Sequence, residues 1–319
     1  MTMMSLLQCV ALSLLIGSVC CNPIQVFSEP GIYDEGELMG ALEGYEPEMS
    51  NMVEEAEDYE DVPDDDMPSL SDIEEAENAD LDQINPTITY GDIAVNPRTR
   101  NAHPCTARGC KWPKHSNGLV YVPVEISSRY NEAEKSVILN GLASFYRTTC
   151  IRFVWRKTSQ DYLSFIPKDG CWSYLGRQGG KQEVSLQRSG CIYHQTVQHE
   201  VLHALGFHHE HVRSDRDNHV TILTKNIIPG KERNFEKTAT NNLRTPYDYN
   251  SVMHYGRFAF STERGKLPTI VPKPNPNVRI GLATQMSSND ILRVNRLYNC
   301  CKYSIFLFGD QLGCLLAAQ

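Results

Sequence analysis

The feature that most constrains this 319-residue chain is the run from His199 to His209. It reads HEVLHALGFHH and matches the pattern H-E-x-x-H-x-x-G-x-x-H. His199 and His203 are four residues apart, so a helix places both imidazoles on one face, one turn apart, where they can bind one zinc ion. The spacing therefore predicts a metal site built on a helix.

The third predicted ligand is His209. It lies ten residues after His199, so a continuous helix at about 100° per residue would direct its side chain roughly 80° away from the metal. The helix must therefore end, and Gly206 can end it by adopting a left-handed conformation that turns the chain back. Three histidines leave one coordination position for water, which is typical of a catalytic rather than a structural zinc site.

Two neighbours of these ligands have different predicted roles. Glu200 directly follows the first ligand and is placed to accept a proton from the zinc-activated water as general base. His208 lies between Phe207 and His209, and alternate side chains of an extended segment point apart. We therefore predict that His208 faces solvent and is not a ligand. Three other nearby histidines are also left out of the ligand set: His194, His211 and His254.

A second element of the site is predicted in the run SVMHY, residues 251–255. A methionine in a tight turn after the third histidine accompanies the extended zinc motif in metzincins, so Met253 is expected to pack beneath the metal. The Tyr255 phenol could reach the ion or donate a hydrogen bond to the oxyanion formed when water attacks. The alternative for Tyr255 is a buried tyrosine with a structural role only.

These motifs resemble the astacin family over about residues 101–300. The resemblance rests on HEVLHALGFHHEHVRSDRD (199–217), SVMHY (251–255), TCIRF (149–153) and GCWSYLGR (170–177). It implies an enzyme, a zinc metalloendopeptidase with one zinc ion per chain. It also implies an α+β fold: a two-lobed metzincin domain with a twisted mixed sheet and two long helices in the upper lobe, and an irregular lower lobe. The active-site cleft would lie between the lobes.

The first of these helices is expected between Ser128 and Tyr146. This segment has apolar residues at helical spacing. Four of them are predicted to face the core: Val137, Ile138, Leu142 and Phe145.

The first hundred residues differ from the rest in charge. Residues 1–21 are typical of a signal peptide because they hold an apolar run from Val10 to Val19 with small residues after it. Of the 39 acidic residues, 23 precede Arg98, the first Lys or Arg of the chain. From Asn101 onward 28 basic residues face 16 acidic ones, a net charge of +12, although the whole chain carries −9. The acidic stretch is a solvated, disordered linker or, alternatively, a docking segment.

Four segments follow from these differences. We predict a signal peptide at 1–21, an acidic propeptide at 22–100, a peptidase domain at 101–300 and an atypical tail of unknown role at 301–319. The run Arg98-Thr99-Arg100 offers a site for an activating protease that cuts after Arg100.

The resemblance also implies that the propeptide supplies a metal ligand. In astacins an Asp of the propeptide binds the zinc in place of water, and Gly91-Asp92 resembles the end of that motif, although Thr89 stands where the pattern has Phe. Asp92 is therefore a predicted metal ligand of the zymogen only, with a plain turn at Gly91-Asp92 as the alternative. Cleavage would free the Asn101 amine, which is expected to enter the lower lobe near Glu210. Otherwise Glu210 would be a surface charge at a helix end.

Disulfide pairing also comes from the resemblance, because six cysteines alone allow fifteen connectivities. It implies three pairs: Cys150 with Cys300, Cys171 with Cys191, and Cys105 with Cys110. This arrangement resembles the fish hatching enzymes, or choriolytic enzymes. Cys301 and Cys314 fall outside the pattern.

The function implied is that of a secreted, extracellular endopeptidase, delivered through secretory granules and made as a zymogen. Its protein substrate would be egg-envelope (chorion) glycoprotein, digested at hatching. One alternative is a digestive or immune-tissue protease of the same family. The other is a zinc-containing binding protein without catalysis, against which the intact Glu200 and Tyr255 argue. We expect no nucleic-acid partner and no membrane span in the mature form.

Overall fold

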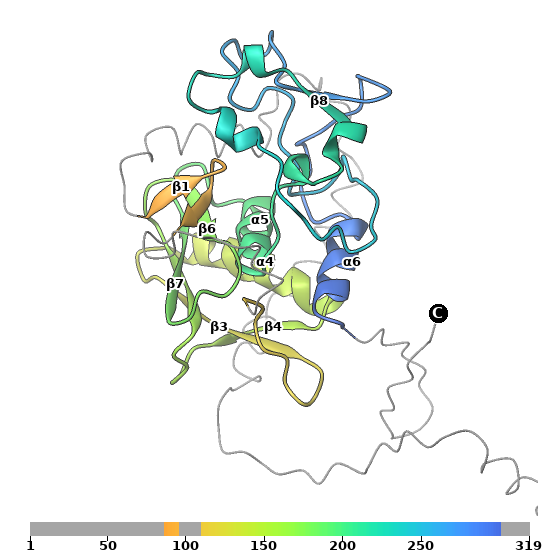
Figure 1. Ribbon diagram of the computed structural model, residues 1–319. Coiled ribbons are helices and arrows are strands. Elements are labelled where there is room, and N and C mark those ends of the chain that lie inside the picture. Colours follow the sequence, from red (N-terminus) through yellow and green to blue (C-terminus); the bar gives the residue numbers. More distant parts are fainter. Residues whose placement is uncertain (1–85, 96–109, 301–319) are drawn as a thin grey trace, which may run out of the picture. The chain divides into compact units, whose positions relative to one another are not determined.

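A seven-stranded mixed sheet forms the framework of the chain, seen in the computed structural model in Figure 1. The structure describes residues 86–95 and 110–300. The strand order is β1-β2-β6-β7-β5-β3-β4. The bounds are Thr87–Thr89 (β1), Ile93–Val95 (β2), Val120–Ile126 (β3), Ile151–Trp155 (β4), Tyr162–Ile166 (β5), Cys171–Tyr174 (β6) and Lys181–Leu186 (β7).

Several predictions fall outside the described residues. They are the signal peptide, the first part of the propeptide, the cleavage site after Arg100, and the tail at 301–319 with Cys301 and Cys314. Within residues 86–95 and 110–300, no helix is long and apolar enough to cross a membrane.

The central strands are parallel and buried. β3 pairs in parallel with both β4 and β5, and β5 pairs in parallel with β7. Their sequences are rich in β-branched and aromatic residues, as in VYVPVEI of β3, because parallel strands covered on both faces need apolar side chains on both. Helix α4 (Glu132–Thr148) makes the crossover from β3 to β4.

Helix α4 begins four residues later than the sequence pattern predicted. Asn131 caps it, since its side chain accepts the Glu134 N–H while the Glu134 carboxylate accepts the Asn131 N–H. This capping box outweighs the apolar pattern in placing the first turn. The predicted inward face is confirmed for its three buried members, which are Ile138, Leu142 and Phe145, whereas Val137 is half-buried.

Helix α5 (His194–Ala204) packs closely against α4. The two helices meet where Gly141 of α4 faces Val197 of α5. A Cβ atom at Gly141 would lie 2.4 Å from Val197 Cγ1, so only glycine permits this approach. From Thr196 to Ala204 every residue of α5 is buried, because the helix lies between α4 and the rest of the core.

The chain after α5 is less regular (Figure 1). It contains four short 3-10 helices, which are η3 (Glu210–Val212), η4 (Arg216–Asn218), η5 (Thr224–Asn226) and η6 (Glu232–Phe235). A two-stranded sheet of β8 (Val220–Ile222) and β9 (Ile270–Pro272) and the helix α6 (Ser288–Leu297) complete it. This region has a hydrophobic cluster of its own, separate from the larger cluster around the sheet and α4. The α+β class with one regular and one irregular lobe is therefore confirmed.

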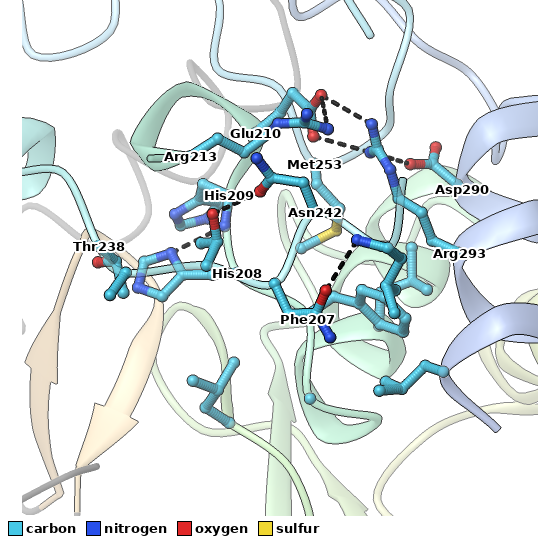
Figure 2. Close-up of a pocket in the computed structure, with 18 residues that line it drawn as sticks. Phe207, His208, His209, Glu210, Arg213, Thr238, Asn242, Met253, Asp290 and Arg293 are labelled. Atoms are coloured by element: carbon cyan, nitrogen blue, oxygen red, sulfur yellow. Dashed lines mark hydrogen bonds and ion pairs between the residues drawn. The ribbon is translucent and has the colours of Figure 1, made fainter. Parts of the chain in front are cut away.

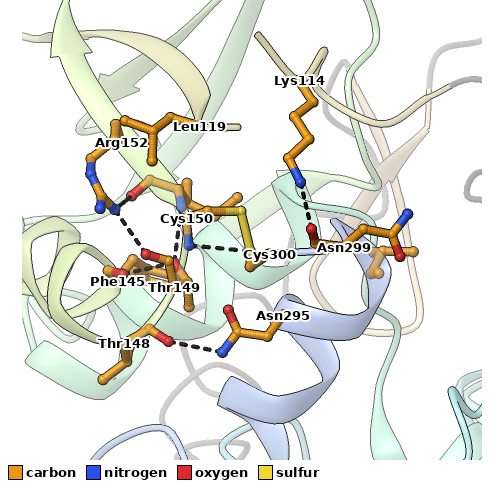
Figure 3. Close-up of a disulfide and its surroundings, with 12 residues drawn as sticks. Lys114, Leu119, Phe145, Thr148, Thr149, Cys150, Arg152, Asn295, Asn299 and Cys300 are labelled. Carbon is orange, nitrogen blue, oxygen red and sulfur yellow. Dashed lines mark hydrogen bonds between the residues drawn. A yellow bond between two sulfur atoms is a disulfide. The ribbon is translucent and has the colours of Figure 1, made fainter. Parts of the chain in front are cut away.

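Two of the predicted disulfides are confirmed. Cys150 is bonded to Cys300, and Cys171 to Cys191. Figure 3 shows the first of these joining Cys150, directly before β4, to Cys300, shortly after α6, beside the hydrogen bond from Asn295 to the Thr148 carbonyl. Cys110 is also disulfide-bonded, but its predicted partner, Cys105, lies outside the described residues.

Candidate metal centre

Two predicted ligands lie one turn apart on α5. His199 and His203 are both buried, with ring centroids 4.7 Å apart. Nδ1 of His199 lies 2.8 Å from the Val252 carbonyl oxygen, and Nδ1 of His203 lies 2.7 Å from the Phe207 carbonyl oxygen. A carbonyl oxygen only accepts hydrogen bonds, so each Nδ1 carries the ring proton and donates it. Both Nε2 atoms therefore present lone pairs to a metal.

Gly206 ends the helix and brings in the third predicted ligand. Its φ angle is 104°, its N–H donates to His203, and the Phe207 N–H donates to Leu202. These are the two hydrogen bonds of a Schellman motif. The turn directs His209 back to the same point, where its ring centroid lies 4.8 Å from that of His203. The predicted role of Gly206 is confirmed.

Asp92 places a carboxylate where the three rings converge. Its Oδ2 lies 3.0 Å from Nε2 of both His199 and His209, and its Oδ1 lies 3.4 Å from Nε2 of His203. One ligand atom from each of these four residues lies within 4.8 Å of the others.

This donor set fits a zinc ion. Nε2 of His199 and Oδ2 of Asp92 are both acceptors, and at 3.0 Å they repel unless a cation lies between them. Two other atoms of the cluster, Asp92 Oδ1 and His203 Nε2, are buried without a hydrogen-bond partner in the described part of the chain. Nitrogen and carboxylate ligands around one point are typical of zinc.

The Glu200 carboxylate lies close enough to Asp92 for the charge of Asp92 to act on it. It is fully buried, and neither of its oxygens has a hydrogen-bond partner among the residues described. Burial, together with the negative charge of Asp92, raises the pKa of Glu200 well above its ordinary value. A carboxylate desolvated in this way readily takes up a proton, as a general base must.

The SVMHY segment (residues 251–255) accepts hydrogen bonds from His199 and from the segment that follows His209. Val252 accepts the hydrogen bond from His199, and the Met253 carbonyl accepts the Glu210 N–H at 2.8 Å. Met253 itself is buried in the larger hydrophobic cluster. The turn therefore orients one ligand and anchors the segment that follows another.

The Tyr255 hydroxyl donates to a peptide carbonyl, that of Tyr90. Between Tyr90 and Asp92 lies Gly91, with a φ angle of +86°. A Cβ atom on Gly91 would lie 2.4 Å from the Tyr255 hydroxyl oxygen and 3.1 Å from the Phe260 ring. Glycine is therefore required here for its conformation and for the close approach of Tyr255.

Backbone pairing positions Asp92. Strands β1 and β2 form an antiparallel hairpin, and β2 adds to the sheet beside β6, with Ile93 opposite Ser173 in parallel register. The Ser173 N–H donates to the Asp92 carbonyl at 3.0 Å. The turn at Gly91-Asp92 is thus part of a strand addition that carries the carboxylate to the histidines.

Glu210 is buried rather than a surface charge. Arg293 on α6 forms two hydrogen bonds to it, at 2.7 and 2.8 Å, and Arg213 a third contact at 3.3 Å (Figure 2). Burial raises the pKa of Glu210 to about 7, against the charges of the two arginines. Glu210 and both arginines line a pocket with about 820 Å³ of empty space, its open mouth included. No sequence pattern indicated Arg293, because it lies 83 residues from Glu210.

The prediction that His208 faces solvent is wrong. Its side chain is half-buried because the Tyr90 ring packs edge-on against it, with centroids 4.4 Å apart. Its Nδ1 accepts the N–H of His209, and His208 is not one of the four residues of the metal cluster. The other omitted histidines also lie outside the metal cluster, with His211 hydrogen-bonded to the Asn234 carbonyl and His254 to the Tyr255 carbonyl.

Known proteins resemble this chain in sequence and structure. Residues 107–299 match the family model described as Astacin, a peptidase family. High choriolytic enzyme 1 of Oryzias latipes is 51% identical over 223 residues, which are 70% of this chain and 81% of the relative. Low choriolytic enzyme of the same fish is 53% identical over 212 residues, which are 66% and 77%. The solved structure of high choriolytic enzyme 1, a hatching enzyme zinc-protease, matches with a TM-score of 0.60 and 53% identity, covering 63% of this chain and 100% of that one.

Proposed function

The chain belongs to the astacin family of zinc metalloendopeptidases, and from this premise we propose that it is a secreted zymogen that digests egg-envelope protein at hatching. The family uses one catalytic zinc ion per chain, and the histidine cluster with Asp92 can hold it. The observation that carries the proposal is the convergence of three Nε2 atoms near Glu200, a buried carboxylate with no hydrogen-bond partner among the described residues.

Each catalytic group has a separate task in this proposal. The metal, when bound, supplies a Lewis acid for the scissile carbonyl and an acidified water molecule. Glu200 accepts the proton of the attacking water and delivers it to the leaving amine. Tyr255 donates a hydrogen bond to the carbonyl oxygen as negative charge develops there, an interaction worth roughly 3 kcal/mol in comparable sites. The support for this last role is that its hydroxyl already donates to a peptide carbonyl.

We propose that the propeptide keeps the precursor inactive. With zinc bound, the Asp92 carboxylate would take the coordination position that water needs, and the Tyr255 hydroxyl is engaged by the Tyr90 carbonyl. Cleavage after Arg100 by an activating protease would release both groups. The freed Asn101 amine is then proposed to enter the pocket at Glu210, where a positive charge would stabilise a carboxylate whose pKa burial raises.

The substrate proposal rests on the choriolytic relatives, whose names describe enzymes that act on the egg envelope. Secretion and delivery through granules are proposed from the same resemblance and from the apolar run at Val10–Val19. The alternative remains a digestive or immune-tissue protease of this family. Transcripts in adult gut or blood-forming tissue, with none in embryonic hatching glands, would favour that alternative.

The test uses the full chain after activation. It should cleave denatured egg-envelope protein, and a zinc chelator should stop the cleavage. Glu200→Gln should lower the cleavage rate by about 10²- to 10⁴-fold, the usual contribution of a general base, while zinc content stays at one ion per chain.

The matched control is Glu236→Gln, which changes an exposed carboxylate and should leave the rate unchanged. Full activity of Glu200→Gln would refute the catalytic assignment. Cleavage of casein without cleavage of the envelope protein would refute the substrate assignment alone.

A further inference from the structure

His211 lies beside the metal centre without belonging to it. The side chain is fully buried, and its ring stacks on the ring of Tyr255, with centroids 4.0 Å apart and planes inclined by 24°. Among the described residues, three other rings lie near Tyr255 at greater centroid distances: His209 at 4.5 Å, Phe260 at 5.9 Å and Phe235 at 6.3 Å. We propose that His211 is a positioning residue that holds the Tyr255 phenol so that its hydroxyl reaches the scissile carbonyl oxygen. This inference rests on the role proposed above for Tyr255.

One hydrogen bond orients the His211 ring. Its Nε2 lies 3.0 Å from the Asn234 carbonyl oxygen, which only accepts, so Nε2 carries the proton and donates it. Its Nδ1 is buried without a hydrogen-bond partner in the part of the chain that the structure describes. The His211 ring is therefore held by one hydrogen bond and by stacking, and one face of the ring packs against Tyr255.

Arg216 links the backbone at His211 to the backbone of the segment that carries Asn234. Its Nη1 donates to the His211 carbonyl at 2.9 Å and to the Phe235 carbonyl at 2.8 Å. Phe235 closes η6, which also carries Asn234, and its ring meets the His211 ring edge-on at 5.6 Å. One guanidinium thus ties the residue that supplies the ring to the segment that orients it.

The stacked position is one from which the phenol reaches a peptide carbonyl. With its ring on His211, Tyr255 donates its hydroxyl to the Tyr90 carbonyl, two residues before Asp92 in the metal cluster. The scissile carbonyl of a substrate is the same chemical group and must also lie beside the metal. A ring that can rotate away from this position would lose part of the stabilisation of the oxyanion, because a hydrogen bond depends steeply on geometry.

The experiment measures kcat and KM of the activated enzyme on a fluorogenic peptide for His211→Gln, Tyr255→Phe and the double variant. Gln keeps a donor for Asn234 but removes the ring. His211→Gln should lower kcat about three- to tenfold, the effect expected for losing one aromatic pair, with KM nearly unchanged. In the Tyr255→Phe background the same substitution should change kcat less than about twofold, because the two residues act through one hydroxyl.

Two further variants separate positioning from general destabilisation. His211→Phe keeps a ring without the donor and should restore most of the kcat lost in His211→Gln. His219→Gln removes another histidine stacked on a tyrosine, Tyr247 at 4.7 Å, and should leave kcat unchanged. If His211→Phe fails to fold, the double-variant comparison decides alone.

The proposal is overturned if His211→Gln lowers kcat by the same factor in both backgrounds, or if its activity follows a loss of bound zinc. Wild-type kcat in Tyr255→Phe would overturn it as well, together with the role of Tyr255. The peptidase assignment would survive that result, because Glu200→Gln tests it separately.

Discussion

Asp92 connects the propeptide to the metal centre through one carboxylate. Two of its three histidine contacts are 3.0 Å long, and both carboxylate oxygens take part. In the proposed zymogen, this side chain is the direct contact between the propeptide and the histidines.

Asp92→Ala should make the uncleaved precursor active. Removing one partner of a buried charged contact costs roughly 2–5 kcal/mol, so activity should rise about 30-fold or more over the latent wild type. The assay is peptide hydrolysis by precursors that carry Arg98→Gln and Arg100→Gln to prevent cleavage. Asp82→Ala, which changes an acidic residue of the same propeptide, should stay latent. An Asp92→Ala precursor without activity would refute the switch.

Gly91→Ala should weaken latency by a different route. The added Cβ would lie 2.4 Å from the Tyr255 hydroxyl oxygen, at a φ angle of +86° that L-residues avoid. Strain of this kind costs of order 1–3 kcal/mol, so leak activity about tenfold above the latent precursor is expected in the same assay. The control is Gly230→Ala, which has a φ of +92° but open space around it, and which should leave latency intact. Unchanged latency in Gly91→Ala would show that the propeptide adjusts at little cost.

At the scale of elements, the contact between α4 and α5 determines where the first two ligands lie. The contact depends on Gly141, which allows Val197 of the metal-binding helix to approach the α4 backbone. Helical propensity would favour alanine at this position by about 1 kcal/mol. The close approach of Val197 disfavours alanine at position 141.

Gly141→Ala should therefore destabilise the protein instead of stabilising it. Overpacking in a tight helix contact costs about 1–3 kcal/mol, more than the gain in propensity. Urea unfolding monitored by circular dichroism measures the change. Ser136→Ala, on the same helix and half-buried, should show no such loss. A Gly141→Ala variant more stable than the wild type would mean that the two helices can separate slightly without penalty.

At the scale of the whole molecule, buried histidines link stability to pH. His254 is buried between the Tyr247 hydroxyl and the Tyr255 carbonyl, and burial lowers its pKa from 6.5 to about 4. The folded pKa is below the unfolded one, so the unfolded chain binds the proton first as pH falls. The contribution of His254 is therefore complete above about pH 6.5 and is lost progressively towards pH 4.

This residue should account for about 2 kcal/mol of the stability lost between about pH 7.5 and 5. The measurement is the free energy of unfolding in urea at both pH values, for the wild type and for His254→Gln. The variant starts less stable because it loses two hydrogen bonds, but its loss on acidification should be smaller by about that amount. Equal losses in the two proteins would show that other groups carry the acid sensitivity.

Much of the site follows from the sequence because its information is local. Helical periodicity places His199 and His203 on one face, and a single glycine conformation at Gly206 accounts for the return of His209. The fold class and two disulfides followed from resemblance, since no spacing rule could select the pairs.

The tertiary structure alone decided which partners these residues meet. His199 is oriented by a carbonyl 53 residues away, and Glu210 is paired with an arginine 83 residues away. His208 looked solvent-facing from alternation but lies under Tyr90. His211, to which the sequence assigned no task, stacks on the Tyr255 ring. Sequence spacing specifies the direction of side chains along one element, whereas contacts between elements depend on how all of them pack.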